Sequence, residues 1–312
     1  MRRVIFAIAD QVELFDLAGP AQVFHEAASA GADYEIIYAG IEERSRSAQG
    51  LGLAKLQSLP PVVQSDDIAI VPGSSVLHRA DWSRKNAAFL AWLRSAHQAG
   101  ATLASVCVGA FALGAAGLLE GRRCTTHWKY VEQLQRRFPR ANVLANRLYI
   151  FDGNIATSAG IASGVDLALA MVERDQSARI AAIVAREMVL SVRRLGSQEQ
   201  LSPYFEGREH MVHEVHVVQD WLVDHPGDVY TLDDLAERAG VSTRTLTRQF
   251  KAATGTTINA YATSLRLEHA RSLLVGGSLT IDQIAERCGF ADGRHLRRLW
   301  KEAHGAPPSA YR

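Results

Sequence analysis

A chain of 312 residues is long enough for two domains with hydrophobic cores of ordinary size. Its composition, 47% hydrophobic and 21% charged residues, is typical of a globular protein. The formal net charge is only +1, so a nucleic-acid partner would be indicated by the distribution of charge and not by its sum. Cys107, Cys124 and Cys288 are too few and too scattered for a disulfide framework or a zinc site, so we expect a reducing compartment and neither a metal nor a cofactor.

The amino terminus is basic and then apolar, which gives it a faint likeness to a signal peptide. Asp10 and Glu13 interrupt the apolar run, so we interpret it as a first buried strand. No apolar stretch reaches the roughly 18 residues that a membrane-spanning helix needs. The sequence thus predicts a cytoplasmic protein with no membrane partner.

Residues 1–175 alternate short apolar runs with helical patterns, which is typical of a parallel sheet covered by helices on both faces. We therefore predict a flavodoxin-like α/β fold. A hairpin of 142–150 with 154–157 is expected around Asp152-Gly153, followed by helices over 161–173 and 178–194. The earlier expected elements are a strand at 4–9, a helix at 17–30, strands at 34–39 and 67–71, a helix at 86–99, a strand at 101–106 and a helix at 109–119.

The segment from Leu195 to Pro203 is polar and has no periodicity, which is typical of a linker that extends to about His210. From Val212 onward every pattern is helical. We predict an α/β domain over residues 1–194, a linker over 195–210 and an all-α domain over 211–312.

The all-α part repeats one helix-turn-helix pattern. Leu232–Ser242 is echoed by Ile281–Ala291, and the second copy has one extra residue after its central glycine. Thr231 or Asp233 can cap the first helix of the first copy, and Ser242 can cap the second. A single helix-turn-helix pattern is weak evidence for DNA binding, because its arginines could simply be solvated on an ordinary helical bundle. A tandem pair with matched core and turn residues is much stronger evidence.

The second helix of each copy is basic. Between Arg238 and Glu268 the chain has no acidic residue. Arginine suits the paired acceptors of guanine, and Gln249 suits adenine or the backbone. Two such helices roughly 34 Å apart would enter successive major grooves of double-stranded DNA. We predict that DNA is contacted by Ser242, Thr243, Arg244, Thr247, Arg248, Lys251, Arg294, His295, Arg297, Arg298 and Lys301.

The helical part carries three further marks, at Tyr261–Leu274, at Ile281–Phe290 and in the closing run Gly305–Arg312. Through these marks residues 212–312 resemble the DNA-binding domain of the AraC family of transcription regulators. This chain departs from the family at Gly293, expected inside the second reading helix at a cost of up to about 1 kcal/mol relative to alanine. Paired reading heads on repeated half-sites imply a homodimer.

The strongest candidate for a reactive residue in the first domain is Cys107. A strand is expected to run into it and a helix to begin directly after it, which is the layout of a nucleophile elbow. The helix dipole and free N–H groups, including those of Val108 and Gly73, would favour a thiolate. Asp16 and His127 are the expected activating partners, although each could instead cap a helix, and a lone cysteine at a strand end is more often a core residue.

The first domain carries a set of short runs around this cysteine and at other strand ends: Asp16–Pro20, Val71–Ser74, Ser105–Ala110, Gly114–Trp128 and Thr157–Gly160. Through these runs residues 1–175 resemble the class I glutamine amidotransferase-like superfamily, in the branch of PfpI-type proteases and isocyanide hydratases. These enzymes have threonine or histidine after the cysteine where this chain has Val108, so the usual Cys-His hydrolysis is not expected.

Together the two resemblances indicate an AraC-type regulator with an amidotransferase-like sensor domain. They imply a small nitrogenous effector such as an amino acid or a quaternary amine. Two alternatives stay open: a cysteine-dependent hydratase or hydrolase fused to a DNA-binding domain, with Cys107 as nucleophile, and a redox sensor that uses the same thiol. We predict that the effector is contacted by Asp16, Gly73, Cys107, Val108, His127 and Ser158.

Overall fold

In this computed structural model the chain forms two compact units, Met1–Gln200 and Leu201–Arg312. The structure describes residues 1–79, 81–190, 194–198, 200, 204, 207–275, 277 and 279–311. The end of the helix expected at 178–194 and part of the expected linker lie outside the described residues.

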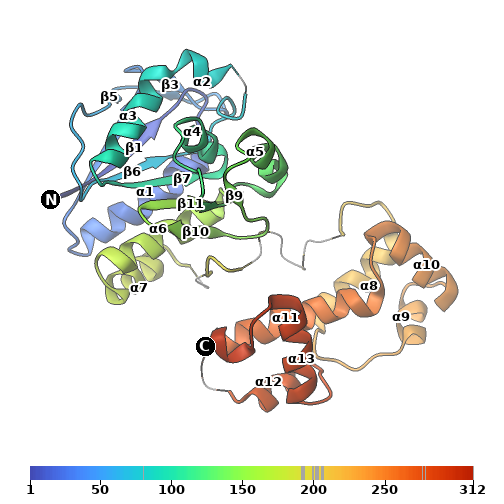
Figure 1. Ribbon diagram of the computed structural model, residues 1–312. Helices are drawn as coiled ribbons and strands as arrows, with labels where there is room; N and C mark the ends of the chain where they lie inside the picture. The colour runs from blue at the N-terminus through green and yellow to red at the C-terminus, as the bar shows by residue number, and fades with distance from the viewer. Residues whose placement is uncertain are drawn as a thin grey trace. The chain divides into compact units, whose positions relative to one another are not determined.

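The first unit is built on a seven-stranded sheet with the order β10-β11-β7-β6-β1-β2-β5 (Figure 1). Strand β10 runs antiparallel to β11, and all other neighbours in the sheet are parallel. This is the flavodoxin strand order, so the predicted fold class is confirmed. The strands are β1 (Arg2–Ile8), β2 (Tyr34–Gly40), β5 (Gln57–Ser58), β6 (Ile68–Val71), β7 (Thr102–Val106), β10 (Tyr149–Asp152) and β11 (Ile155–Ser158).

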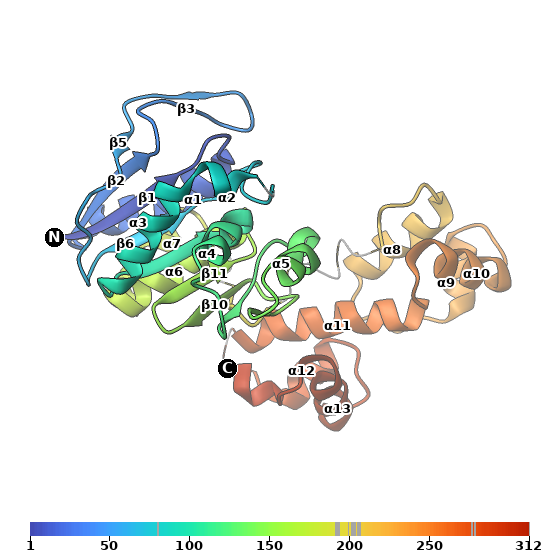
Figure 2. The same cartoon turned by 45° about the horizontal axis from the view of Figure 1, so that its top comes forward.

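Helices cover both faces of this sheet (Figures 1 and 2). Helices α1, α6 and α7 pack together on one face, and α3 and α4 pack on the other. The helices are α1 (Leu14–Ser29), α2 (Trp82–Lys85), α3 (Ala87–Gln98), α4 (Ala110–Ala115), α5 (Val131–Arg137), α6 (Ala162–Asp175) and α7 (Ala178–Glu187), with short 3-10 turns η1 (Cys107–Gly109) and η2 (Trp128–Tyr130).

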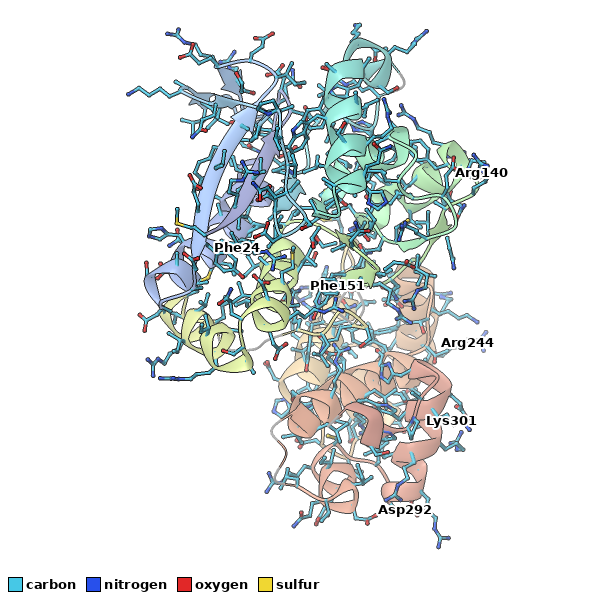
Figure 3. All side chains as sticks on the ribbon, turned by 60° about the vertical axis from the view of Figure 1, so that its left-hand side comes forward. Phe24, Arg140, Phe151, Arg244, Asp292 and Lys301 are labelled. Carbon is cyan, nitrogen blue, oxygen red and sulfur yellow. The ribbon has the colours of Figure 1, made fainter. Side chains whose placement is uncertain are left out.

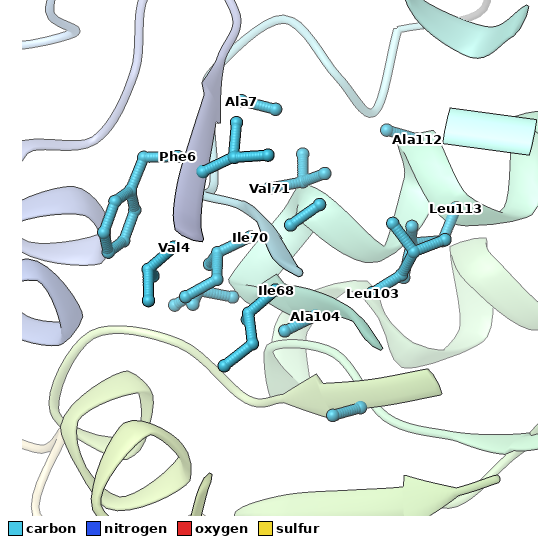
Figure 4. Close-up of a cluster of buried hydrophobic side chains, with 14 of the residues drawn as sticks. Val4, Phe6, Ala7, Ile68, Ile70, Val71, Leu103, Ala104, Ala112 and Leu113 are labelled. Carbon is cyan, nitrogen blue, oxygen red and sulfur yellow. The ribbon is translucent and has the colours of Figure 1, made fainter. Parts of the chain in front are cut away.

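The central strands are apolar on both sides because both of their faces are covered. Phe6, Ile70 and Leu103 come from three neighbouring strands and are almost completely buried in one cluster (Figure 4). Polar residues follow the carboxyl ends of these strands, as at Asp10 and Ser74. The carboxyl edge of the sheet is therefore where the fold can place chemistry.

The expected hairpin is only partly correct. Tyr149–Asp152 and Ile155–Ser158 do pair as antiparallel strands. The residues before them do not extend the first strand, because Asn146 adopts a left-handed φ of 59° and turns the chain. Asn142–Val143 instead forms β9, which pairs with β8 (Arg123–Cys124).

Two expected helices are shorter than predicted. Helix α7 ends at Glu187, and Val189 behind it has a φ of 54°. Helix α4 ends at Ala115, shortly before the left-handed Gly117. A further small hairpin, β3 (Ser45–Arg46) with β4 (Gly52–Leu53), follows β2.

The described elements of the second unit are all helices and include both predicted helix-turn-helix repeats (Figures 1 and 2). Helix α11 belongs to two hydrophobic clusters: Tyr261 and Leu265 pack with the first repeat, whereas Ala270 and Leu274 pack with the second. The elements are α8 (His213–Asp224), α9 (Leu232–Arg238), α10 (Thr243–Thr254), α11 (Ile258–Val275), α12 (Ile281–Arg287), α13 (Gly293–His304) and η3 (Pro308–Tyr311).

The described ends of the expected linker pack on different units. The carbonyls of Gly196 and Gln198 both accept from the Leu148 N–H at 3.1 Å in the α/β unit. On the helical side, Arg208 pairs with Asp220 at 2.7 Å. No described helix is both long and apolar enough to cross a membrane.

Candidate functional site

The reading helices begin at side-chain caps. Ser242 accepts the Thr245 N–H at the start of α10, as predicted, and Asp292 accepts the His295 N–H at the start of α13. The preceding helix α9 starts with a capping box in which Thr231 and Asp234 bond each other's backbone N–H groups. These caps accept hydrogen bonds from backbone N–H groups that have no partner within the first turn of the helix. They also fix where the second helix of each repeat starts.

Helix α10 presents a basic face that is free of acids. Leu246 and Phe250 are fully buried, which leaves Arg244, Arg248 and Lys251 exposed. These three cations form no ion pair with any residue that the structure describes, and Figure 3 places Arg244 at the surface of the unit. An open hollow of about 800 Å³ borders them and is lined also by the first residues of α11. The arrangement suits a phosphate backbone beside base-reading side chains.

Helix α13 is more heavily charged. Leu296 and Trp300 are buried. The exposed residues include Arg294, Arg297 and Lys301, the last of which is labelled in Figure 3. An acid accompanies these cations, because Arg298 pairs with Glu302 one helical turn later at 3.0 Å. The second repeat thus carries more cations than the first but is partly neutralised.

Gly293 has a different role from the one expected. It is the first residue of α13, directly after the cap, and is buried against α12. A β-carbon at this position would overlap Asp282 Oδ1. At the matching place in the first repeat, Thr243 donates its hydroxyl to Asp233. Glycine therefore permits a close approach between α12 and α13 and is not simply a defect in a helix interior.

Several expected contact groups are occupied within the protein. Thr243 is held by Asp233, and the His295 ring lies edge-on to Phe290 at 5.6 Å. Gln249 is half-buried and its Oε1 is buried, so the contact with adenine or the backbone suggested for it stays a prediction. Thr247 donates its hydroxyl to the Thr243 carbonyl at 2.9 Å and leaves its methyl group for contact.

In the α/β unit, Cys107 forms the predicted elbow. It follows β7, has a left-handed φ of 57° and begins η1, which leads into α4. A non-glycine residue in this region costs of order 1–3 kcal/mol and persists only where the surrounding structure enforces it. Val108 directs its N–H toward the sulfur. The strand-turn-helix layout read from the sequence is confirmed.

Cys107 is closely surrounded. A β-carbon at Gly73 would overlap Asp16 Oδ2, and one at Gly160 would lie 2.9 Å from the Cys107 sulfur. Asp16 is fully buried and accepts the N–H of Ile161 at 2.6 Å through Oδ1. Asp16, Gly73, Cys107 and Val108 thus meet as predicted, but none of them lines the cavity of about 470 Å³ at the same edge of the sheet.

The expected thiolate is not favoured. Burial raises the pKa of Cys107, and the nearby Asp16 carboxylate raises it further, which outweighs the Val108 N–H. Burial also raises the pKa of Asp16 to about 6, although the Ile161 N–H and the Cys107 thiol favour its ionised form. The elbow therefore places a thiol with a raised pKa beside a carboxyl group whose pKa is raised to about 6, an arrangement that does not favour the expected thiolate.

His127 and Ser158 have structural contacts of their own. His127 accepts the Lys129 N–H at 3.3 Å and caps η2, which is the structural role considered for it. Ser158 is buried at the end of β11 and donates to the Ser105 carbonyl at 3.4 Å. Contact of these two residues with an effector stays a prediction.

Sequence reasoning missed Thr126, Gly160 and Ile161. Thr126 donates its hydroxyl to the Cys107 carbonyl at 2.8 Å and so ties the elbow to the segment before His127. Gly160 and Ile161 close the site from the turn between β11 and α6. The run ending at Gly160 marked this turn, but nothing local indicated its partner.

Metal ligation finds no support among the residues that the structure describes, where no group of three or more His, Cys, Asp or Glu side chains is placed to hold an ion. The three cysteines are buried and free.

Comparison with known proteins agrees with this division. Residues 2–174 match the DJ-1/PfpI family, and residues 235–312 match a helix-turn-helix domain. The transcriptional regulator ArgR of Pseudomonas aeruginosa is 30% identical over 69% of this chain, which spans 65% of that relative. CdhR of the same species is 28% identical over 84% of this chain and 76% of its own length. The chain thus spans about two thirds of the first of these relatives.

Solved structures agree on the fold of the α/β unit. A chain described as an AraC family transcriptional regulator from Pseudomonas putida covers 61% of this chain with 22% identity and a TM-score of 0.53, and all of that chain is matched. DJ-1β of Drosophila melanogaster also covers 61%, with 19% identity and a TM-score of 0.53 over 99% of its length. The chain belongs to the DJ-1/PfpI family and carries, after that domain, a helix-turn-helix domain of the AraC type.

Proposed function

We propose that this chain is a sequence-specific DNA-binding transcription regulator whose α/β unit senses a small metabolite. The observation that carries the proposal is the pair of capped, basic reading helices α10 and α13, mounted on the common helix α11. Arginines on such helices can reach base edges in the major groove, and lysines can fix the register on phosphates. The relatives ArgR and CdhR are named as transcriptional regulators, which supports the same function.

A regulator is favoured over a cysteine-dependent hydratase or hydrolase. A nucleophilic cysteine needs a thiolate and an adjacent base. Here burial raises the pKa of Cys107, Val108 supplies no base, and the His127 ring caps a turn. The same raised pKa disfavours the redox-sensor alternative, since oxidation follows thiolate character and exposure.

Partners follow from the DNA-binding function. We infer a homodimer, because paired reading heads match repeated half-sites, and a location in the cytoplasm with the DNA. The effector is proposed to be a small nitrogenous metabolite, an amino acid or a quaternary amine. Its binding would have to differ between two states of the regulator to change DNA affinity.

The test is a fluorescence-anisotropy titration of the purified full chain with duplex DNA from upstream of its own gene, against a scrambled duplex and over a series of salt concentrations. We expect tighter binding to the upstream duplex and a dissociation constant that rises steeply with salt. Arg94→Ala is the control for arginine substitutions in α10 such as Arg248→Ala, since Arg94 is an exposed arginine of the α/β unit. Absent binding, or equal binding to both duplexes, would refute the proposed function.

A further inference from the structure

A partly open cavity at the carboxyl edge of the sheet does not include Cys107. This cavity of about 470 Å³ lies where β1 and β2 end, and the segment after β6 and helix α2 complete its wall. Figures 1 and 2 show β3 and α2 at this end of the unit. Its volume falls within the roughly 300–1,000 Å³ typical of small-molecule sites. It also lies at the switch point of this strand order, where the chain passes from β1 to β2 on one side and then crosses to β6 on the other side of β1.

The cavity combines a buried apolar floor with a charged rim. Ile8 and Trp82 are 2% and 7% exposed and form part of the lining. Three carboxylates and three cations surround them. Asp81 and Lys85 pair with each other at 2.8 Å, so they offset one another. The other four charged groups of the rim are Asp10, Glu42, Arg44 and Arg79.

These four groups present both signs of charge. Ile8 pairs with Gly40 in the β1–β2 register, so Asp10 and Glu42 each follow their strand by two residues and place carboxylates at adjacent strand ends. Arg44 and Arg79 come from the loop after β2 and the segment before α2. Neither arginine, nor Glu42, forms an ion pair or a side-chain hydrogen bond with any described residue.

We propose that this cavity, and not the elbow at Cys107, binds the effector, and that the effector is a zwitterion with a primary ammonium and a carboxylate, such as an α-amino acid. Arg44 and Arg79 hold the carboxylate, for which guanidinium groups offer paired donors. Asp10 and Glu42 accept from the ammonium. This proposal rests on the proposed function only in calling the ligand an effector. Binding of the ligand to the cavity does not require DNA.

The lining disfavours a quaternary amine. A quaternary ammonium has no N–H to donate and is recognised on exposed aromatic faces. Trp82 is the aromatic residue among the described lining residues, and it is buried with its ring edge-on to Phe89 at 5.6 Å. A hydrogen-bonding ammonium is therefore the better match to the two carboxylates.

The cavity wall is connected to the start of α1. The Ala48 N–H donates to the Val12 carbonyl at 2.9 Å, and Gln49 donates to Glu13 at 2.5 Å while its Oε1 accepts the Leu14 N–H at 3.2 Å. A ligand that draws the loop after β2 inward would pull on these bonds and on α1, which carries Asp16. This gives the ligand a physical route to a second state of the unit.

The experiment is calorimetric titration and thermal shift of the purified full chain with each of the twenty common L-amino acids and with N,N,N-trimethylglycine. We expect at least one amino acid to bind and raise Tm, and trimethylglycine not to bind. Arg44→Gln with Arg79→Gln should weaken that binding at least tenfold. Arg84→Gln, an exposed α2 arginine outside the lining, should leave it unchanged.

Three results would overturn the proposal. They are no binding of any amino acid, binding of trimethylglycine alone, and amino-acid binding that survives the double arginine variant but is lost in Cys107→Ser. The DNA titration is run on the same preparations. Retained DNA binding with any of these results rejects the cavity and keeps the regulator, whereas lost DNA binding with retained amino-acid binding rejects the regulator alone.

Discussion

The two helix-turn-helix repeats share one plan and distribute charge differently. In the first, α10 carries three unpaired cations among hydroxyl side chains and is capped by Ser242. In the second, α13 carries more cations and an acid at Glu302, and its cap is the acidic Asp292, which is labelled in Figure 3. Because base discrimination needs few well-placed donors and backbone binding needs charge, we expect the first repeat to read sequence and the second to supply mainly phosphate affinity.

The largest expected effect is on stability, and it tests whether the two repeats unfold independently. Phe250 and Trp300 occupy matching buried positions in separate clusters. Removing either aromatic side chain should cost about 3–5 kcal/mol. Hydrogen exchange should show that Trp300→Ala lowers protection in α12 and α13 more than in α9 and α10, with Phe250→Ala giving the reverse. Equal loss of protection in both repeats from either variant would mean that they unfold as one unit.

A second comparison tests the division between base reading and phosphate binding. Arg248 is unpaired, whereas Arg298 already interacts with Glu302. Arg248→Ala should cost about 1–3 kcal/mol in binding the upstream duplex and relax sequence preference, and Arg298→Ala should cost less and weaken all duplexes alike. Glu302→Gln is the control and should strengthen binding to every duplex. A larger sequence-specific loss from Arg298→Ala would reverse the assignment of the two repeats.

Gly293 offers a stability test of the same comparison. Gly293→Ala should destabilise the second repeat by about 1–3 kcal/mol, since its β-carbon would overlap Asp282. Thr243→Ala removes only a hydroxyl bond to Asp233 and should cost about 1 kcal/mol. Urea unfolding measures both. If the double variant Gly293→Ala with Asp282→Ala is no more stable than Gly293→Ala alone, the close approach is not the cause.

The smallest expected effect is a difference in acid sensitivity. Hydrogen bonds from the His295 N–H and the Thr231 N–H lower the pKa values of Asp292 and Asp234 respectively. A lowered folded pKa gives stability that is present above the unfolded value of about 3.9 and is lost as pH falls through the folded pKa. Below about pH 4, therefore, the first repeat should loosen at α9 and the second at α13.

Exchanging the caps tests this assignment. Asp292→Ser should make the start of α13 insensitive to acid, and Ser242→Asp should confer sensitivity on α10, as followed by amide chemical shifts. The recognition helix of the second repeat would then be the acid-sensitive one because of a single residue. Unchanged acid sensitivity of α13 in Asp292→Ser would contradict the role of the cap.

Local patterns predicted most of the helical unit. The caps of the first repeat follow from residue type and position: the structure has Ser242 at the second helix and, of the two candidates for the first helix, Thr231 and not Asp233. The burial of the Gln249 Oε1 could not be predicted in the same way, because it depends on tertiary packing and not on helical period.

The elbow could be predicted in layout but not in chemistry. Strand and helix patterns around Cys107 fixed the turn, whereas its closeness to Gly160 and the bond from Ile161 to Asp16, 145 residues apart, depend on how distant segments meet. Those contacts decide burial, and burial decides the pKa of the thiol. The charged cavity was missed for the same reason, since Asp10, Glu42 and Arg79 carry no shared local signal.

Helix α11 fixes the separation of the two DNA elements that one chain can read. One continuous helix, Ile258–Val275, belongs to the cores of both repeats, so their phase is determined by the number of residues between Leu265 and Ala270. Each residue of an α-helix adds about 1.5 Å and about 100° of rotation. Adding or deleting one residue there would swing one reading head out of alignment with the groove, so natural operators should vary in sequence but hardly in the separation of the two elements read by one chain.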